Sequence, residues 1–255
     1  MQVDGEGPQE VLCARAPTQP DEPTEEEKKE HYDSGHARFR SWCGHCLAGR
    51  GRVQPHVARG EQGELPEIGL DYFYLAAREG ETLPNVAGKD RRTGSLAGST
   101  LPAKGVDKYA IAYLVGWLRG LGYRRVVVCS DNEPAILALI AAIVLSIPEI
   151  EVVPRPSIEG DHQANGLAEV GVREVKNQAL VLRSHVESNY GRRLDADEPL
   201  LAWVVRNGAN VMNRYRVGED GRTPGQRRVG KKWKRAAVQF GEIVYDKPVQ
   251  STARN

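Results

Sequence analysis

Short β-rich runs alternate with longer helical runs along residues 67–214, and this alternation constrains the fold more than any other sequence feature. Apolar spacing, β-branched residues and Gly/Pro breakers predict three strands first, then helix and strand in turn. The predicted strands are 67–75, 82–88, 95–102, 125–129 and 149–153. The predicted helices are 106–121, a helix that opens at the cap Ser130 or Asp131 with Pro134 in its first turn and runs to about residue 146, then 167–187 and 196–214. This order implies a mixed five-stranded α/β sheet with helices on both faces.

The size and composition of the chain fit one or two domains in a reducing compartment. It has 255 residues, of which 40% are hydrophobic and 27% are charged, enough for one substantial core. Four unevenly placed cysteines are too few for a disulfide framework. The longest apolar run, 134–145, is far shorter than the ~20 residues of a membrane span, and the N-terminus has no signal pattern. Secretion and membrane insertion are therefore disfavoured.

Formal charge divides the chain into blocks. The net charge is +1, made up of −6 in residues 1–30, +4 in 31–60, −5 in 61–200 and +8 in 201–255. Two basic regions could hold a polyanion while the acidic middle binds cations such as metal ions; the plainer reading is solvated surface. With the composition, these blocks predict a disordered acidic leader over 1–30, a zinc-binding-like segment over 31–60, a core over 65–215 and a basic extension over 216–255.

Three acidic residues fall where the predicted strands and helices meet. Asp71 lies inside the first strand among apolar neighbours, where a carboxylate is costly without a partner or a role. Asp131 ends the fourth strand, at the sheet edge where ligand sites form in open α/β folds, and Glu169 lies in the first turn of a helix. Each acid also has a simpler interpretation. Asp71 could face solvent from the strand, Ser130 or Asp131 could be a helix N-cap, and Glu169 could interact with the helix dipole.

The sequences around these acids resemble the DDE integrase core, the ribonuclease-H-like catalytic domain of retroviruses and retrotransposons. VVVCSDNEPAI is similar to the family's strand and SDNG element, and HQANGLAE, which ends in Glu169, is similar to its second motif. Fifty-nine residues separate the first pair of acids and thirty-seven the second. The second interval is slightly longer than in the family, and we expect the additional residues in loop 157–161. The resemblance implies a ribonuclease-H-like fold and catalysis by Asp71, Asp131 and Glu169.

Phosphodiester transfer is chemistry that suits three converging carboxylates. Negative charge develops on the entering and leaving oxygens, and two divalent cations about 3.5–4 Å apart can stabilise both. Mg²⁺ and Mn²⁺ prefer carboxylate oxygens among protein ligands. The resemblance implies that Asp71 bridges two such ions, that Asp131 holds one of them, and that Glu169 holds the other.

Two basic residues follow Glu169 along the same helix face. Arg173 and Lys176 stand at i+4 and i+7 from it. In the integrase family these positions touch the DNA end, and the resemblance implies that Gln163 and Asn165 in the preceding loop contact it too. Taken alone, the pattern fits an exposed ion pair between Glu169 and Arg173, worth about 0.3–0.5 kcal/mol.

Histidines and cysteines gather between residues 31 and 46. The CxxC of Cys43 and Cys46, with two histidines, supplies four ligands for tetrahedral Zn²⁺, whereas a redox CxxC would sit in a βαβ pattern that this segment lacks. The set resembles the integrase N-terminal zinc module, but six residues between His36 and Cys43 are too few for that module's three-helix bundle. We expect a shortened zinc knuckle held by His36, Cys43 and Cys46. The fourth ligand is open between His31, His45 and His56, and the alternative is an unmetallated loop with exposed thiols.

The C-terminal region packs six cations around Trp233. They are Arg227, Arg228, Lys231, Lys232, Lys234 and Arg235. Residues 222–245 resemble the stretch beyond the core of copia-type integrases, which has a helix starting at Thr-Pro and a strand at Phe-Gly-Glu. These cations can neutralise DNA phosphates without reading sequence, or can act as a nuclear import signal, and the sequence does not separate the two.

Together these features predict an integrase of a retrotransposon-type element, or a piece of its polyprotein, that nicks element DNA ends and joins them to target DNA. The resemblance implies double-stranded DNA as partner, a homo-oligomer because two ends are joined together, and a nuclear and cytoplasmic location or a virus-like particle. Two alternatives are a catalytically inactive, integrase-derived nucleic-acid-binding protein and a ribonuclease-H-type nuclease acting on RNA–DNA hybrids. The integrase-like residues around Glu169 disfavour the nuclease.

Overall fold

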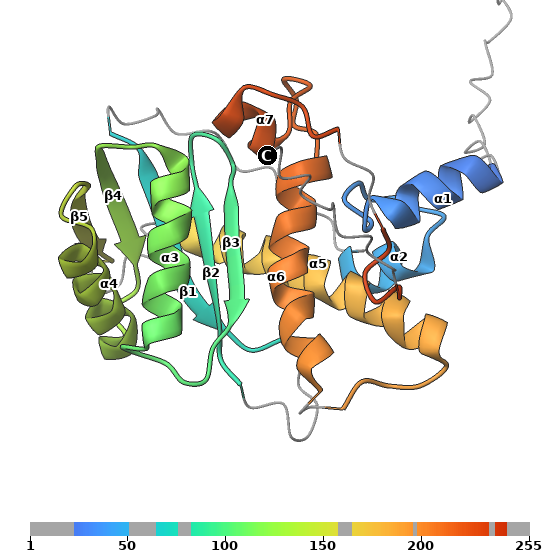
Figure 1. Cartoon of the computed structure of the whole chain (residues 1–255), viewed down its shortest axis with the longest axis horizontal. Coiled ribbons are helices and arrows are strands. Elements are labelled where there is room, and N and C mark those ends of the chain that lie inside the picture. The colour runs from blue at the N-terminus through green and yellow to red at the C-terminus, as the bar shows by residue number, and fades with distance from the viewer. Residues whose placement is uncertain are drawn as a thin grey trace, which may run out of the picture.

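A five-stranded sheet forms the centre of the computed structural model, which describes residues 23–50, 65–75, 83–157, 165–195, 198–234 and 238–243 (Figure 1). Strand order is β3-β2-β1-β4-β5, with β1–β2 and β2–β3 antiparallel and β1–β4 and β4–β5 parallel. The strands are β1 (Glu67–Phe73), β2 (Asn85–Asp90), β3 (Leu96–Thr100), β4 (Arg125–Ser130) and β5 (Glu151–Pro156). The predicted mixed α/β sheet is confirmed. β5 begins two residues later than predicted because a turn closed by the Ile150 N–H on the Ile147 carbonyl (3.0 Å) precedes it.

Helices cover both faces of the sheet, so an apolar core forms on each face. Helices α3 (Lys108–Leu121) and α4 (Pro134–Ser146) cover one face, and α5 (Gly166–Tyr190) and α6 (Pro199–Tyr215) cover the other. Alternation along β1 serves both cores: Leu70 packs in the first and Phe73 in the second. Asp71 therefore faces α5 and α6. None of the helices in the described residues is both long and apolar enough to cross a membrane.

The helix ends follow the local sequence, with one correction. Helix α3 begins after Asp107, whose side chain accepts from the Ala110 N–H at 2.9 Å, and it ends at Gly122 in the left-handed region (φ 75°). Helix α4 has Glu133 as N-cap and Pro134 at its first position. The expectation that Ser130 or Asp131 caps α4 is wrong, because the chain runs two further residues before helical geometry begins. Asp131 is therefore not committed to capping.

Ordered structure begins earlier in the chain than its composition suggests. Helix α1 (Glu25–Asp33) has a complete capping box between Thr24 and Glu27, so residues 25–30, assigned to the disordered leader, are helical. Residues 1–22 lie outside the described residues. Helix α2 (Gly44–Arg50) follows and packs against α5 (Figure 1).

The C-terminal region carries one short helix and one turn. Helix α7 (Pro224–Val229) begins at the predicted Thr-Pro, with Thr223 and Gln226 forming a capping box, and packs against α6. Residues 238–243 contain a turn, closed by the Glu242 N–H on the Gln239 carbonyl at 3.1 Å, so the strand expected at Phe-Gly-Glu is absent from these residues.

Candidate active site and metal centre

Asp71 and Asp131 come together because β1 and β4 are parallel neighbours. The register pairs Gly69 with Cys129, and continuing it by two residues places Asp71 opposite Asp131. Adjacent strands lie about 4.8 Å apart. The two acids predicted from separate motifs therefore share one face at the carboxyl edge of the sheet, and both are half-buried.

The surroundings of Asp71 disfavour its charged form. Burial, and then the neighbouring Asp131 carboxylate, raise the pKa of Asp71 to about 6. The Tyr72 N–H, which donates to Asp71 Oδ1 at 2.7 Å, and a hydrogen bond from the Asn165 side chain act in the opposite direction. Asp131 Oδ1 accepts from the Glu133 N–H at 3.2 Å. A buried carboxylate beside a second carboxylate is an arrangement that a divalent cation stabilises.

The first turn of α5 lies against the same face of β1. A Cβ on Gly69 would stand 2.4 Å from the backbone nitrogen of Ala168, so only glycine permits this approach. Glu169 follows Ala168 and is exposed. Among the described residues, no group of three or more close metal-ligating side chains includes the three acids. The structure therefore aligns Asp71 with Asp131 and places Glu169 on the adjoining helix turn, and the three carboxylates do not form a close group of ligands.

Lys104 and Glu133 are site residues that sequence reasoning missed. Lys104 Nζ lies 2.8 Å and 2.9 Å from the two carboxylate oxygens of Glu133, and 5.3 Å from the centre of the Tyr72 ring. Glu133 also contributes to the raised pKa of Asp71. The available signal is the sequence SDNE, which places an acid where the family motif SDNG has glycine.

The two predicted DNA contacts on α5 flank, in sequence, a residue that belongs to a buried ion cluster. Arg173 is exposed and Lys176 is half-buried, while Gln163 lies outside the described residues. Between them Glu174 is buried and bonded to Lys89 (2.5 Å) and Arg216 (2.6 Å). Burial alone would raise the pKa of Glu174, but these two cations lower it. Asn165 is the N-cap residue of α5, and its side chain bonds Asp71 rather than the helix N-terminus.

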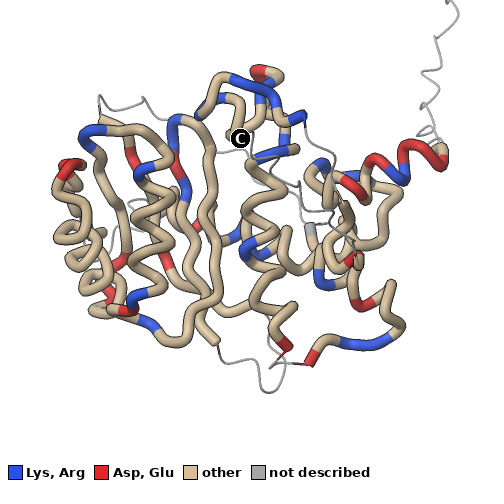
Figure 2. Tube along the Cα trace, in the orientation of Figure 1, with Lys and Arg blue, Asp and Glu red and all other residues tan. Residues whose placement is uncertain are grey.

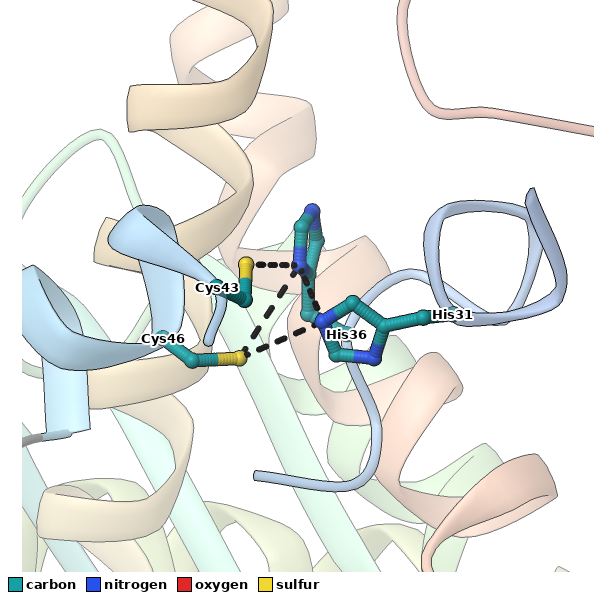
Figure 3. Close-up of side chains that lie close together, drawn as sticks. All are labelled: His31, His36, Cys43 and Cys46. Carbon is teal, nitrogen blue, oxygen red and sulfur yellow. Dashed lines mark hydrogen bonds between the residues drawn. The ribbon is translucent and has the colours of Figure 1, made fainter. Parts of the chain in front are cut away.

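A second group of ligands meets at the N-terminal segment. The ligand atoms of His31, His36, Cys43 and Cys46 all lie within 4.8 Å of one another, and all four residues are buried (Figure 3). His36 Nδ1 lies 3.0 Å from His31 Nε2 and 3.4 Å from Cys43 Sγ, and Cys46 Sγ lies 3.5 Å from His31 Nε2. This His₂Cys₂ set could hold zinc in tetrahedral geometry.

Protonation in this cluster also suits a metal. Burial lowers the pKa of His36 to about 4, which keeps the imidazole neutral and able to donate its lone pair. The hydrogen bond from Cys43 lowers the pKa of the Cys46 thiol, and the same bond raises that of Cys43. One thiolate is thus stabilised before a metal binds, and a divalent ion would release the second proton.

The geometry separates the candidates for the fourth ligand. His31 completes the set, whereas His45 Nδ1 lies 2.8 Å from Ser184 Oγ on α5 and is not part of the cluster. His56 lies outside the described residues. The bond to Ser184 shows that His45 ties the cluster to the core.

The six predicted C-terminal cations are not equivalent. Arg227 pairs with Asp220 (Nε–Oδ2 2.9 Å) and donates to the Thr93 carbonyl at 3.0 Å, so it anchors α7 to the sheet. Lys234 is exposed, and Arg235 lies outside the described residues. The remaining three, Arg228, Lys231 and Lys232, line a cavity of about 570 Å³ between α3, α6 and α7.

Two solved structures resemble the chain. One is a chain of the simian T-cell lymphotropic virus intasome, determined by cryo-EM with the PP2A regulatory subunit B56 gamma. The alignment covers 81% of this chain and 68% of the intasome chain, at 16% identity and TM-score 0.50. The catalytic core domain of BIV integrase covers 64% of this chain and 93% of its own length at 15% identity and TM-score 0.42. No protein-family model and no curated protein sequence matches the chain. The sheet order and the likeness to the intasome chain show an integrase-type, ribonuclease-H-like fold.

Proposed function

We propose that this chain is a DDE integrase of a retrotransposon-type element, which nicks element DNA ends and transfers them into target DNA. The observation that carries the proposal is the register that places Asp71 opposite Asp131 under the first turn of α5, which bears Glu169. The integrase-type fold supports it. Three acids from separate elements then serve one phosphodiester-transfer site.

Asp71, Asp131 and Glu169 would hold two Mg²⁺ or Mn²⁺ ions. The raised pKa of Asp71 fits this role, because a bound cation relieves the repulsion from Asp131. The ions supply Lewis-acid activation of the attacking oxygen and charge stabilisation at the phosphate. Asn165 orients the Asp71 carboxylate through its hydrogen bond. Lys104 holds Glu133 in place beside this pair.

Basic and polar side chains around the site would bind the duplex. Gln163, Asn165, Arg173 and Lys176 contact the element end near the scissile phosphate. Cations of the C-terminal region, led by Lys234 and Arg235, add salt-dependent affinity for the DNA backbone. Because two DNA ends are joined together, a homo-oligomer would act on them, and the chain would occur in the nucleus and the cytoplasm. Zn²⁺ bound by His31, His36, Cys43 and Cys46 orders the N-terminal segment.

A branched DNA that mimics the strand-transfer product tests this function, because its resolution is the reverse reaction and does not require the unknown element end. With Mn²⁺ we expect the wild type to resolve the branch and the Asp131→Asn variant to lose at least about 10³-fold in rate, in line with loss of a metal-bound transition-state interaction. Equal resolution by both proteins would refute the assignment of Asp131.

One observation favours a second candidate, a non-catalytic nucleic-acid-binding protein. Glu169 is exposed and does not form a close group of ligands with the two aspartates in the described structure. An inactive protein would bind DNA but resolve no branch at any Mn²⁺ concentration. An RNA–DNA hybrid in the same assay distinguishes the ribonuclease-H-type alternative, which would cleave the hybrid and leave the branch intact.

A further inference from the structure

A cationic cavity lies at the β3 edge of the sheet. Its walls come from α3, α6, α7 and the residues that follow α7, and its volume of about 570 Å³ is that of a typical ligand site. Its basic side chains are Arg206, Arg214, Arg228, Lys231 and Lys232. Figure 2 shows basic segments gathered on α7 and on the chain after it. Strand β3 is separated from β1 by β2, so the cavity is distinct from the Asp71 site.

These five cations are not neutralised by the part of the chain that the structure describes. No acidic residue lines the cavity, and no ion pair joins any of the five to a described carboxylate. Arg227, beside Arg228 on α7, is by contrast paired with Asp220. Uncompensated charge in a concave site concentrates positive potential there. The cavity therefore suits a ligand with several negative charges.

Aromatic rings accompany the cations. The guanidinium carbon of Arg214 lies 4.1 Å from the centre of the Trp233 ring, and that of Arg206 lies 5.3 Å from the centre of Tyr113. A guanidinium stacked on a ring keeps its in-plane N–H donors available for phosphate. Trp233 remains 38% exposed. Proteins that bind single-stranded nucleic acids combine cations that contact phosphates with exposed aromatic rings on which bases stack.

We propose that this cavity binds an unpaired, single-stranded segment of nucleic acid. Its phosphates contact the five cations, and a base packs against Trp233. A duplex keeps its bases stacked inside a wide helix that does not enter a cavity of this size, whereas unstacked nucleotides do. Asn210, exposed on the cavity wall, offers an amide to a base edge. The inference goes beyond end joining, because the site needs neither metal ion nor carboxylate.

Fluorescence anisotropy with labelled oligo(dT), in buffer without added divalent cations, tests the proposal on the full chain. We expect the wild type to bind oligo(dT), and a duplex of equal length is the second probe because the proposed end-joining site also binds DNA. The Arg214→Ala/Lys232→Ala variant should bind about tenfold more weakly, and its slope of log K against log salt should flatten by about 1.4, the equivalent of two phosphate contacts. Trp233→Leu should weaken binding about tenfold through lost stacking.

The matched control removes the same charges elsewhere. Lys29 and Arg193 are exposed, and Lys29→Ala/Arg193→Ala should keep the wild-type affinity within about twofold. Equal losses in both double variants would overturn the proposal, as would a loss of duplex affinity in Arg214→Ala/Lys232→Ala as large as its loss of oligo(dT) affinity. Pyrophosphate that displaces oligo(dT) at equal phosphate concentration would show a site for free phosphates, and would also overturn it. Because no Mg²⁺ or Mn²⁺ is added, these outcomes are independent of strand-transfer activity.

Discussion

Asp71 shows how the sheet changes the chemistry of a single residue. Its pKa rises from 3.8 to about 6 because of burial and the neighbouring Asp131 carboxylate. The folded state therefore binds this proton more tightly than the unfolded chain does. The protonated group favours folding at low pH, and this advantage is lost as the pH rises from about 4 through about 6.

Asp71→Asn should make the protein more stable at neutral pH when no divalent cation is present. We expect a gain of about 1–2 kcal/mol in the free energy of unfolding at pH 7 and no gain near pH 4. The gain is smaller than the full pKa shift implies because Asp71 is half-buried and solvent screens its charge. Urea unfolding across this pH range measures it. Glu26→Gln, which removes an exposed carboxylate from α1, is the control. Identical pH profiles for the two variants would contradict the raised pKa.

His31 and His45 should respond differently to the same substitution. His31→Ala removes a ligand, so bound zinc should fall from about one ion per chain to well below one, whereas His45→Ala should keep it. Elemental analysis after dialysis counts the metal. Cys129→Ser, at a buried cysteine outside the cluster, is a further control. Loss of zinc from His45→Ala alone would reverse the assignment.

At the residue scale, the sequence could predict positions on strands but not contacts from loops. Asp71 and Asp131 are identifiable because Asp71 lies in β1 and Asp131 directly follows β4, each in a recognisable motif, and parallel neighbours align their carboxyl ends. The bond from Asn165 to Asp71 and the pairing of His45 with Ser184 join residues far apart in sequence. Their partners depend on how α5 packs, which local patterns do not encode.

Helix α5 is the element on which both candidate sites depend. Its first turn carries Glu169. The N-terminal segment packs on the middle of α5, because Val181 of α5 contacts Cys43 and Cys46. The Gln178 side-chain amide donates to the Gly35 carbonyl. Most elements were predictable because their periodicity and caps agree. Helix α1 is not predicted, because the acidic composition of residues 1–30 indicates disorder whereas the capping box of Thr24 and Glu27 indicates a helix.

Gly69→Ala should displace the start of α5. The added Cβ would meet the Ala168 backbone at 2.4 Å, so we expect a loss of about 1–3 kcal/mol in stability together with most of the branch-resolving activity. The control is Gly116→Ala in α3, where nothing lies within 4 Å and the better helix former should add up to about 1 kcal/mol. Chemical denaturation and the branch assay read both effects. Full activity in Gly69→Ala would contradict the role of this contact.

At the scale of the whole molecule, the metal-binding segment packs directly on the core, so we expect the two to unfold together. Helix α2 packs along α5, and Gly35 fits against Val211 of α6 so closely that a Cβ would lie 2.7 Å from its side chain. Removing zinc should therefore destabilise the core as well. We expect chelation to lower Tm by roughly 6–12 °C, equivalent to about 3 kcal/mol, in a single calorimetric transition. Two transitions, with the core Tm unchanged, would show independent units.

Anomalous diffraction from crystals soaked in MnCl₂ shows whether Asp71 and Asp131 bind divalent metal ions. We expect manganese density between Asp71 and Asp131, with zinc density among the four His and Cys ligands as an internal control. In Asp131→Asn crystals the manganese density should disappear while the zinc density remains. Zinc density with no manganese beside Asp71 in the wild type would contradict the claim that these carboxylates form a divalent-metal centre.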